Sequence, residues 1–183
     1  MTASTCRVNA ESPIRTLRDL IEFGKTQRIT FGNWATGAHA HMAAQQLAKK
    51  YALNVEPVAY KGEAAMWVDL ASGQTTVAMG SALAMSPHLQ SGKLRAVAVT
   101  TRARSPLLPQ VPTFVEQGLP EPIFTVQGWV GMFAPVNTPR VRQINKTFGM
   151  AEKPWTAAEF EKLDRENKPL WIALAQELNI TLD

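Results

Sequence analysis

Short strand-like segments alternate with helical segments over most of the first 118 residues. Each strand-like segment is a brief apolar run, and small or polar residues separate it from the next helix. Strands are predicted at residues 28–31, 55–60, 75–79, 94–100 and 128–134, and helices at 38–51, 62–70 and 83–90. This alternation is typical of proteins in which neighbouring strands pair in parallel and helices cover the sheet. We therefore expect an α/β fold with a mostly parallel sheet flanked by helices.

Capping patterns predict where several helices begin. Ser12 followed by Pro13 is typical of an N-cap and a first helical residue. Two further pairs have the spacing of a capping box, namely Thr113 with Glu116 and Thr156 with Glu159. In the segment after Thr156, apolar residues keep a 3.6-residue period as far as residue 178, which predicts a long amphipathic helix. Pro169 interrupts this segment and predicts a kink or a break near Asn167.

Composition excludes several classes of protein. Apolar residues make up 45% of the chain and charged residues 19%, which are globular values. The longest stretch without a charged residue, 70–92, contains many polar side chains, so no segment is predicted to span a membrane. Residues 1–11 contain no apolar run, so no signal peptide is visible. Cys6 is the single cysteine, and the net charge of +4 is too diffuse for a nucleic-acid surface but suits small anions.

The loop at residues 32–38 is the first candidate binding site. It joins a predicted strand to a predicted helix, and the free N–H groups at a helix N-terminus attract carboxylates and phosphates. Thr36 adds a hydroxyl, Gly37 permits close approach of the backbone, and Ala38 opens the helix. An ordinary strand–helix turn is the competing interpretation. The loop is not a P-loop, because no Gly-Lys-Ser/Thr follows it.

A second loop, at residues 60–62, follows the next predicted strand and is expected at the same edge of the sheet. Tyr60 is a candidate to contact a small ligand, although a half-buried tyrosine at a strand end is the alternative. Trp34 is the tryptophan placed best to reach a ligand, because it lies in the first loop. The predicted ligand-binding residues are Trp34, Thr36, Gly37, Ala38, Tyr60 and Gly62.

Neither a metal centre nor a catalytic centre is predicted, and no cofactor is expected. His39 and His41 are two residues apart on a helix, so their side chains point to nearly opposite faces and cannot bind one metal together. Ser81, His88 and Asp69 form a triad on paper only, since the sequence lacks a Gly-x-Ser-x-Gly motif. An α/β hydrolase or transferase is therefore the least favoured hypothesis.

A series of short motifs keeps a fixed order and spacing between residues 11 and 142. In chain order they are Ser12-Pro13, Ala35-Thr36-Gly37-Ala38, His41-Met42, Ala59-Tyr60-Lys61-Gly62, Asp69-Leu70, Ser91-Gly92-Lys93-Leu94-Arg95, Val111-Pro112-Thr113-Phe114, Trp129-Val130-Gly131 and Phe133-Ala134-Pro135. This series resembles the receptors of the tripartite tricarboxylate transporter family, the Bug-type periplasmic solute-binding proteins. The stretch from Ser91 to Thr100 is the most specific match.

The resemblance implies a lobe of the type II periplasmic-binding-protein fold. Residues 11–122 would form the ligand-binding lobe, which is the second lobe of the family. Residues 1–10 and 123–183 would supply hinge strands and part, or a remnant, of the first lobe. The opening segment of that first lobe has no counterpart in this sequence, so the chain resembles an N-terminally truncated receptor.

The resemblance also implies a ligand, a partner and a location. Backbone groups of the Thr36 loop, beside Tyr60 and Gly62, would hold a small carboxylate. Membrane transporter subunits would be the protein partners, and the location would be periplasmic. The chain as it stands carries no visible signal peptide, so expressed alone it is expected in the cytoplasm.

Some positions depart from the family pattern. Ala35 stands where glycine is usual, Gln45 where glutamate is common, and Thr75-Thr76 where Val-Asp is usual. The leading hypothesis is a non-catalytic solute-binding protein, or a truncated derivative, that recognises a small carboxylate. The alternative is an interaction remnant without a ligand, which would form a homodimer through apolar surface left exposed by the missing lobe.

Overall fold

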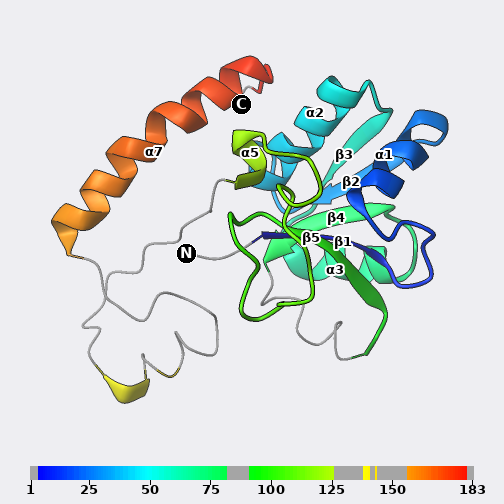
Figure 1. The fold of residues 1–183 in the computed structure, drawn as a ribbon, viewed down its shortest axis with the longest axis horizontal. Helices are drawn as coiled ribbons and strands as arrows, with labels where there is room; N and C mark the ends of the chain where they lie inside the picture. The colour runs from blue at the N-terminus through cyan, green and yellow to red at the C-terminus, as the bar shows by residue number, and fades with distance from the viewer. Residues whose placement is uncertain (1–3, 82–90, 126–137, 141–142, 144–155, 181–183) are drawn as a thin grey trace.

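The computed structural model describes residues 4–81, 91–125, 138–140, 143 and 156–180 (Figure 1). Its strands are β1 (Ser4–Asn9), β2 (Ile29–Asn33), β3 (Val55–Ala59), β4 (Val77–Ser81) and β5 (Leu94–Val99). Its helices are α1 (Leu17–Thr26), α2 (His39–Tyr51), α3 (Glu63–Ala71), α5 (Pro122–Thr125) and α7 (Ala157–Glu177). The strands predicted between residues 28 and 100 and the helices predicted at 38–51 and 62–70 are confirmed. The helix predicted at 83–90 and the strand predicted at 128–134 lie outside the described residues.

The sheet has the strand order β3-β2-β4-β1-β5. β2 pairs in parallel with both β3 and β4, whereas β1 pairs antiparallel with both β4 and β5. β1 is therefore the one strand of this sheet that runs against the others, and the prediction of a mostly parallel sheet is confirmed.

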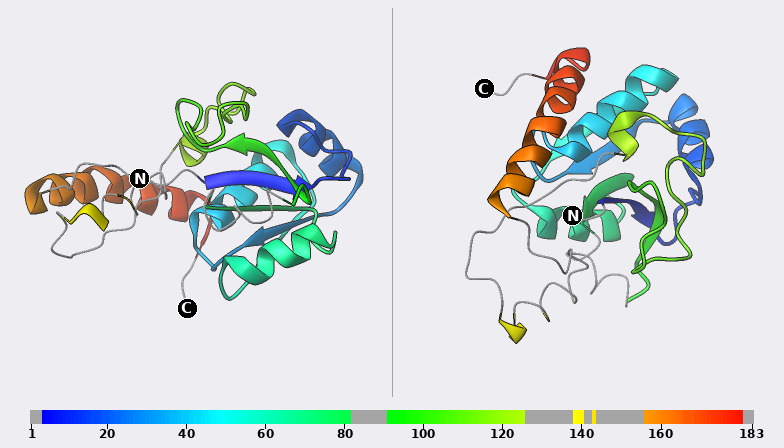
Figure 2. Two further views of the ribbon diagram at one scale, coloured as in Figure 1. Left: turned by 90° about the horizontal axis from the view of Figure 1, so that it is seen from below. Right: turned by 60° about the vertical axis from the view of Figure 1, so that its left-hand side comes forward.

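The strand order explains why α2 and α3 lie on opposite faces of the sheet. The chain passes from β2 outward to β3 through α2, and then returns across β2 to β4 through α3. Crossovers between parallel strands are right-handed, so a reversal of direction moves the helix to the other face. Figure 2 shows α3 alone below the sheet, with α1 and α2 on the other side. The larger core, between the sheet and α1, α2, α5 and α7, is almost entirely apolar.

The smaller core contains a buried arginine that the sequence pattern did not reveal. Cys6 and Val8 of β1 face the larger core, whereas Arg7 lies on the α3 face and is 0% exposed. Its guanidinium lies over the Trp67 ring, 5.2 Å from the ring centroid, and among the described residues none of the guanidinium nitrogens has a hydrogen-bond partner. Burial lowers the pKa of Arg7 to about 9, and the negative charge of Glu63 opposes that shift.

The structure departs from two predictions about helices: Ser12 is not the N-cap of α1, and the last helix is not broken near Asn167. The N-cap of α1 is Thr16 rather than Ser12, because Asp19 completes a capping box with Thr16. Ser12 instead accepts a local hydrogen bond from the Ile14 N–H, at 3.3 Å. α7 also continues through Pro169 without a break. Pro169 is exposed, so its ring meets solvent rather than the core.

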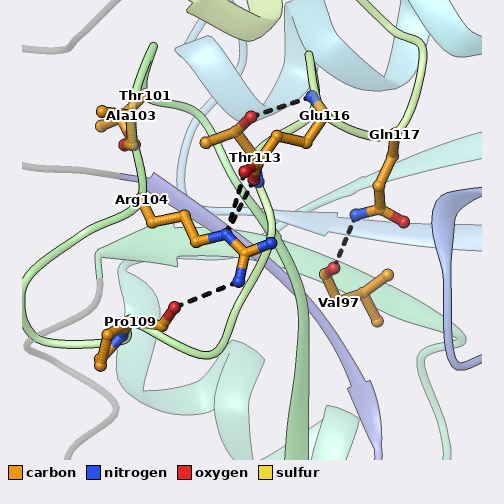
Figure 3. A network of polar contacts seen from close by, with 8 residues as sticks. All are labelled: Val97, Thr101, Ala103, Arg104, Pro109, Thr113, Glu116 and Gln117. Atoms are coloured by element: carbon orange, nitrogen blue, oxygen red, sulfur yellow. Dashed lines mark hydrogen bonds and ion pairs between the residues drawn. The ribbon is translucent and has the colours of Figure 1, made fainter.

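The capping box predicted at Thr113 and Glu116 is confirmed and anchors the long loop after β5 (Figure 3). The Glu116 carboxylate accepts from the Thr113 N–H at 2.7 Å and from Arg104, while the Glu116 N–H donates to the Thr113 hydroxyl. The hydrogen bond from the Thr113 N–H is the main reason why the pKa of Glu116 is lowered. Gln117 joins the same loop to the sheet by donating to the Val97 carbonyl at 2.9 Å.

The last helix packs on α2 through its C-terminal half. The Trp171 ring meets the His39 ring edge-on at 5.8 Å, and Leu174 and Leu178 are buried in the larger core. Figures 1 and 2 show that the N-terminal half of α7 extends away from the sheet. No helix within the described residues is both long enough and apolar enough to cross a bilayer.

Candidate functional site

The candidate site lies at the edge of the sheet where β2 and β3 end. Asn33 pairs with Ala59 at the ends of these parallel strands, and the Tyr60 N–H donates to the Asn33 carbonyl at 2.9 Å. The two loops predicted to share an edge are therefore neighbours. From this edge α2 departs to one face of the sheet and α3 to the other. Ligands of open α/β sheets bind at such carboxyl ends of strands.

The N-terminus of α2 is open to an anion. Its N-cap, Ala38, makes no side-chain cap, and its first turn contains no acidic residue. No acceptor for the N–H groups of His39, Ala40 or His41 is found among the described residues. By contrast, α1 and α7 both begin with complete capping boxes. Unsatisfied N–H groups and the positive end of the helix dipole together favour a bound carboxylate or phosphate.

The loop before α2 presents its predicted residues in different ways. Thr36 is exposed to solvent. Trp34 is half-buried and packs against the larger core. Gly37 adopts a positive φ of 74°, a conformation that favours glycine. The Ala38 N–H donates to the Ala35 carbonyl at 3.2 Å, which tightens the turn and leaves α2's own N–H groups as the open donors.

His39 anchors the first turn of α2 inside the molecule. Its ring lies 2.6 Å from the Ile123 carbonyl through Nε2 and 3.3 Å from the Ser4 hydroxyl through Nδ1. Burial lowers the pKa of His39, and no charged side chain contributes to the shift. The neutral ring therefore joins the start of α2 to β1, to α5 and, through Trp171, to α7. Its position fixes the direction of the open N–H groups.

His41 lies on the opposite side of the helix and acts on the loop. Its Nδ1 accepts a hydrogen bond from the Gly37 N–H at 2.9 Å, so one of the predicted backbone donors is already in use. The two histidines therefore diverge as the sequence predicted. Within the described part of the chain, no three His, Cys, Asp or Glu side chains come together to hold a metal ion.

Tyr60 and Gly62 are at the same edge but have other roles in the structure. The Tyr60 hydroxyl donates to Asp69 at 2.9 Å and lies 2.8 Å from the Thr75 hydroxyl, so protein groups already satisfy it. Burial is the main reason why the pKa of Tyr60 is raised. Gly62 is exposed, has a φ of 101° and is the N-cap of α3. These features leave the ligand contacts of both residues as predictions.

The start of α3 supplies its own negative charge. Glu63 accepts hydrogen bonds from the Ser81 N–H at 2.9 Å and from the Ser81 hydroxyl at 2.8 Å. Asp69, six positions further along α3, accepts a hydrogen bond from the Tyr60 hydroxyl. His88, the third member of the triad considered on paper, lies outside the described residues.

Sequence reasoning considered His39 and His41 only as metal ligands and missed their structural contacts. For His41 a signal was available, because it is the third residue of α2, the position from which an acceptor side chain reaches back in a capping box. For His39 no local signal existed, since Ser4 and Ile123 are distant in the sequence.

The family model described as tripartite tricarboxylate transporter family receptor matches residues 2–179. A UPF0065 protein from the tcbD-tcbE intergenic region of Pseudomonas sp. strain P51 is 31% identical over 149 residues, which are 79% of this chain and 44% of that protein. Protein BugT of Bordetella pertussis is 36% identical over 112 residues, covering 60% of this chain and 33% of that protein. The chain thus spans less than half the length of each of these two relatives.

Solved structures share the fold. The periplasmic binding protein BugD has a TM-score of 0.84 at 23% identity, covering 98% of this chain and 67% of that chain. R. palustris Rpa4515 with adipate has a TM-score of 0.80 at 24% identity, covering 98% and 66%. MatC from Rhodopseudomonas palustris with bound malate has a TM-score of 0.79 at 19% identity, covering 94% and 66%. The α/β fold is therefore that of periplasmic binding proteins, and its likeness extends over about two thirds of each of these neighbours.

Proposed function

Because the chain belongs to the tripartite tricarboxylate transporter receptor family, we propose that it binds a small carboxylate at the N-terminus of α2 and acts in solute uptake. The proposed contacts are the N–H groups of His39 and Ala40, the Thr36 hydroxyl and the backbone around Gly37. Tyr60 and Gly62 would border the ligand from the end of β3. The function is binding rather than catalysis.

One observation carries this proposal. α2 begins without a capping side chain and without an acid, at the point where β2 and β3 end and their helices diverge. A carboxylate placed there would satisfy N–H groups that have no acceptor among the described residues. The net charge of +4 favours the approach of such an anion.

The neighbours suggest which carboxylates to try first. Adipate and malate are the molecules named with two of the similar structures, and both are small dicarboxylates. One carboxylate would bind at α2, and the other end of the ligand would extend from the edge of the sheet. We therefore propose small di- or monocarboxylates as the ligand class.

We further propose residues 11–122 as the ligand-binding lobe, with β1 as the strand that completes its sheet. Residues 123–183, which include α7 and all of α5 except Pro122, would belong to the hinge and to the partial first lobe. Membrane transporter subunits and a periplasmic location complete the proposal, by analogy with the family.

Amide-resolved NMR would test the proposal directly. Malate or adipate should shift the amide resonances of residues 36–41 and leave those of the α1 N-terminus unchanged, because Thr16 and Asp19 already satisfy that helix. Malamide, the uncharged diamide of malate, is the matched control and should give no shift. Shifts that are absent, or equal for malate and malamide, would contradict carboxylate binding at α2.

One feature favours the alternative of self-association. Ile172 of α7 is 49% exposed, and the N-terminal half of this helix extends away from the sheet (Figure 1). Light scattering across a concentration series would detect a dimer. A monomer at all concentrations would remove this alternative, and Ile172→Lys should abolish any dimer that forms through α7.

A further inference from the structure

The hydrogen bond between Gly37 and His41 occupies one N–H donor of the candidate site. The Gly37 N–H points to His41 Nδ1 at 2.9 Å, and this bond requires Nδ1 to carry no proton. The neutral ring must then carry its proton on Nε2. A carboxylate that approaches the loop therefore meets the N–H groups of α2 but competes with His41 for that of Gly37.

His41 is the third residue of α2, and at the starts of α1 and α7 and in the Thr113 turn this third position is occupied by a carboxylate residue. In α1 the third residue, Asp19, accepts from the N–H four residues before it, Arg15, at 2.9 Å. Glu116 and Glu159 hold the equivalent place in the Thr113 turn and in α7. These three acceptors are carboxylates, which stay charged and stay acceptors at neutral pH. His41 is the acceptor that a proton can convert into a donor.

Burial lowers the pKa of His41, and no charge on the described residues contributes to the shift. His39, on the same helix, turns to the opposite side. β4 carries no ionisable side chain. Two ion pairs lie at the far end of α2, Lys49 with Glu177 and Lys50 with Glu121. The pair of Arg28 with Glu56 lies where β2 and β3 begin, at the opposite end of these strands. The ring of His41 is thus set to respond to solvent and to a bound anion.

We propose that neutral His41 occupies the Gly37 N–H and that protonated His41 releases it, so that the site takes up a carboxylate together with a proton. The Gly37 N–H is called closed while it donates to His41 and open once it is released. This proposal rests on the proposed function, because it assigns a proton-linked step to the same site. It names His41 as a ligand-contacting residue and makes the affinity for carboxylates depend on pH.

The proton balance is simple. A proton from solvent adds to His41 Nδ1, and the Gly37 N–H···Nδ1 hydrogen bond breaks. The Gly37 N–H and the new Nδ1–H then both donate to the incoming carboxylate, one to each oxygen. Release of the ligand returns the proton to solvent and restores the original hydrogen bond.

Two substitutions at His41 distinguish its role as a hydrogen-bond acceptor from its ability to bind a proton. His41→Asn keeps an acceptor of the length that Asp19 uses in α1 but cannot be protonated, so Gly37 should stay closed at every pH. His41→Phe removes the acceptor, so Gly37 should stay open at every pH. At pH 8 the Phe variant should bind malate about fivefold more tightly than wild type, the effect of one released hydrogen bond.

The measurement is the ratio of malate affinities, wild type to His41→Asn, at pH values between 8 and 5.5. Titration of malate itself cancels in this ratio, which should rise about tenfold as the pH falls, because a charged donor replaces a competing acceptor. Calorimetry in two buffers of different ionisation enthalpy should show proton uptake by wild type and none by His41→Asn. Lys49→Gln, at the far end of α2, is the control variant and should titrate like wild type.

The outcomes distinguish the two proposals. A ratio that does not change with pH, or wild type that binds malate without taking up a proton, would overturn the role of His41 and leave carboxylate binding intact. Malate and adipate that leave the amides of residues 36–41 unshifted at every pH would overturn carboxylate binding and the role of His41 together. Amide spectra of both variants without ligand verify that each retains the fold.

Discussion

α2 and α3 begin at the same edge of the sheet, but their N-caps and first turns differ in charge and in conformation. The start of α2 has an ordinary N-cap conformation, no acid and open N–H groups. The start of α3 has Gly62 in a conformation rare for other residues, and Glu63 in its first turn. Beneath Glu63 lies the buried Arg7, whose charge it stabilises. The start of α3 therefore has a fixed anion of its own and a buried cation from β1 that interacts with it, whereas the start of α2 has no anion among its first residues.

This difference assigns separate roles to the two helix starts. An external carboxylate gains most where the protein has left donors unsatisfied, and gains least where a fixed carboxylate already repels it. We therefore expect substitutions at α3 to change mainly stability and substitutions at α2 to change mainly ligand affinity.

The largest effect is expected from Glu63→Gln. This change removes the carboxylate that acts on the fully buried guanidinium of Arg7, so the free energy of unfolding should fall by about 2–3 kcal/mol. Urea unfolding monitored by circular dichroism would measure it. Adding Arg7→Met, which replaces the cation with an apolar side chain, should recover most of the loss. A double variant no more stable than Glu63→Gln would show that the charges of Arg7 and Glu63 are not coupled.

A smaller loss is expected from Gly62→Ala. The φ of 101° and ψ of 167° at this N-cap are costly for any residue with a Cβ, so we expect a loss of about 1–2 kcal/mol although no atom lies within 4 Å of the added carbon. Ala38→Gly is the matched control, since Ala38 has a φ of −68°. Its thermal midpoint should stay close to that of wild type. Equal losses at the two caps would contradict the contrast between them.

Ala38→Asp would give α2 a capping side chain, as α1 and α7 already have. The new carboxylate should cap the open N–H groups, raise stability by about 0.5–1 kcal/mol and weaken malate binding at least about tenfold. Calorimetric titration and thermal unfolding on the same preparation would measure both effects. Unchanged malate affinity would place the ligand elsewhere than α2.

The smallest effect is a pH dependence from His39. Its pKa is lowered in the folded protein, so the unfolded chain takes up a proton first as the pH falls. The associated stability is complete above the unfolded pKa, about 6.5, and decreases below it, at no more than about 1.4 kcal/mol per pH unit. His39→Gln, which retains a donor for the Ile123 carbonyl, should have a flatter stability profile between pH 7 and 5. Parallel profiles would mean that His39 does not cause the acid sensitivity.

Local patterns predicted much of the fold. The alternation of apolar runs predicted β2 to β5 and the helices between them, and threonine–glutamate spacing predicted the capped turns at Thr113 and Thr156. The loop around Thr36 was found because a strand followed by a small-residue turn and a helix is a local signal. Helix N-termini at that edge then followed from the parallel sheet.

Other features depend on distant partners and could not be predicted. Residues 4–9 include Arg7, and only pairing with β4 and β5 explains a charged side chain in a buried strand. The same holds for His39, which depends on Ser4 and Ile123. Pro169 has another reason: helix α7 tolerates it because it is exposed, and the sequence alone did not show that exposure. At Ser12 two local signals competed, and Asp19 decided in favour of Thr16.

The place of β1 in the sheet also affects how the chain folds. This strand precedes both of its partners in the chain, and Thr5 pairs with Gly80 on one side and with Val99 on the other. β1 can therefore pair only after β4 and β5 are available. Pairing over such sequence distances slows folding, because loop closure precedes any gain in contact energy. During that delay the arginine at its centre remains hydrated. Insertion of β1 and dehydration of that charge are thus expected to be late, coupled steps in folding.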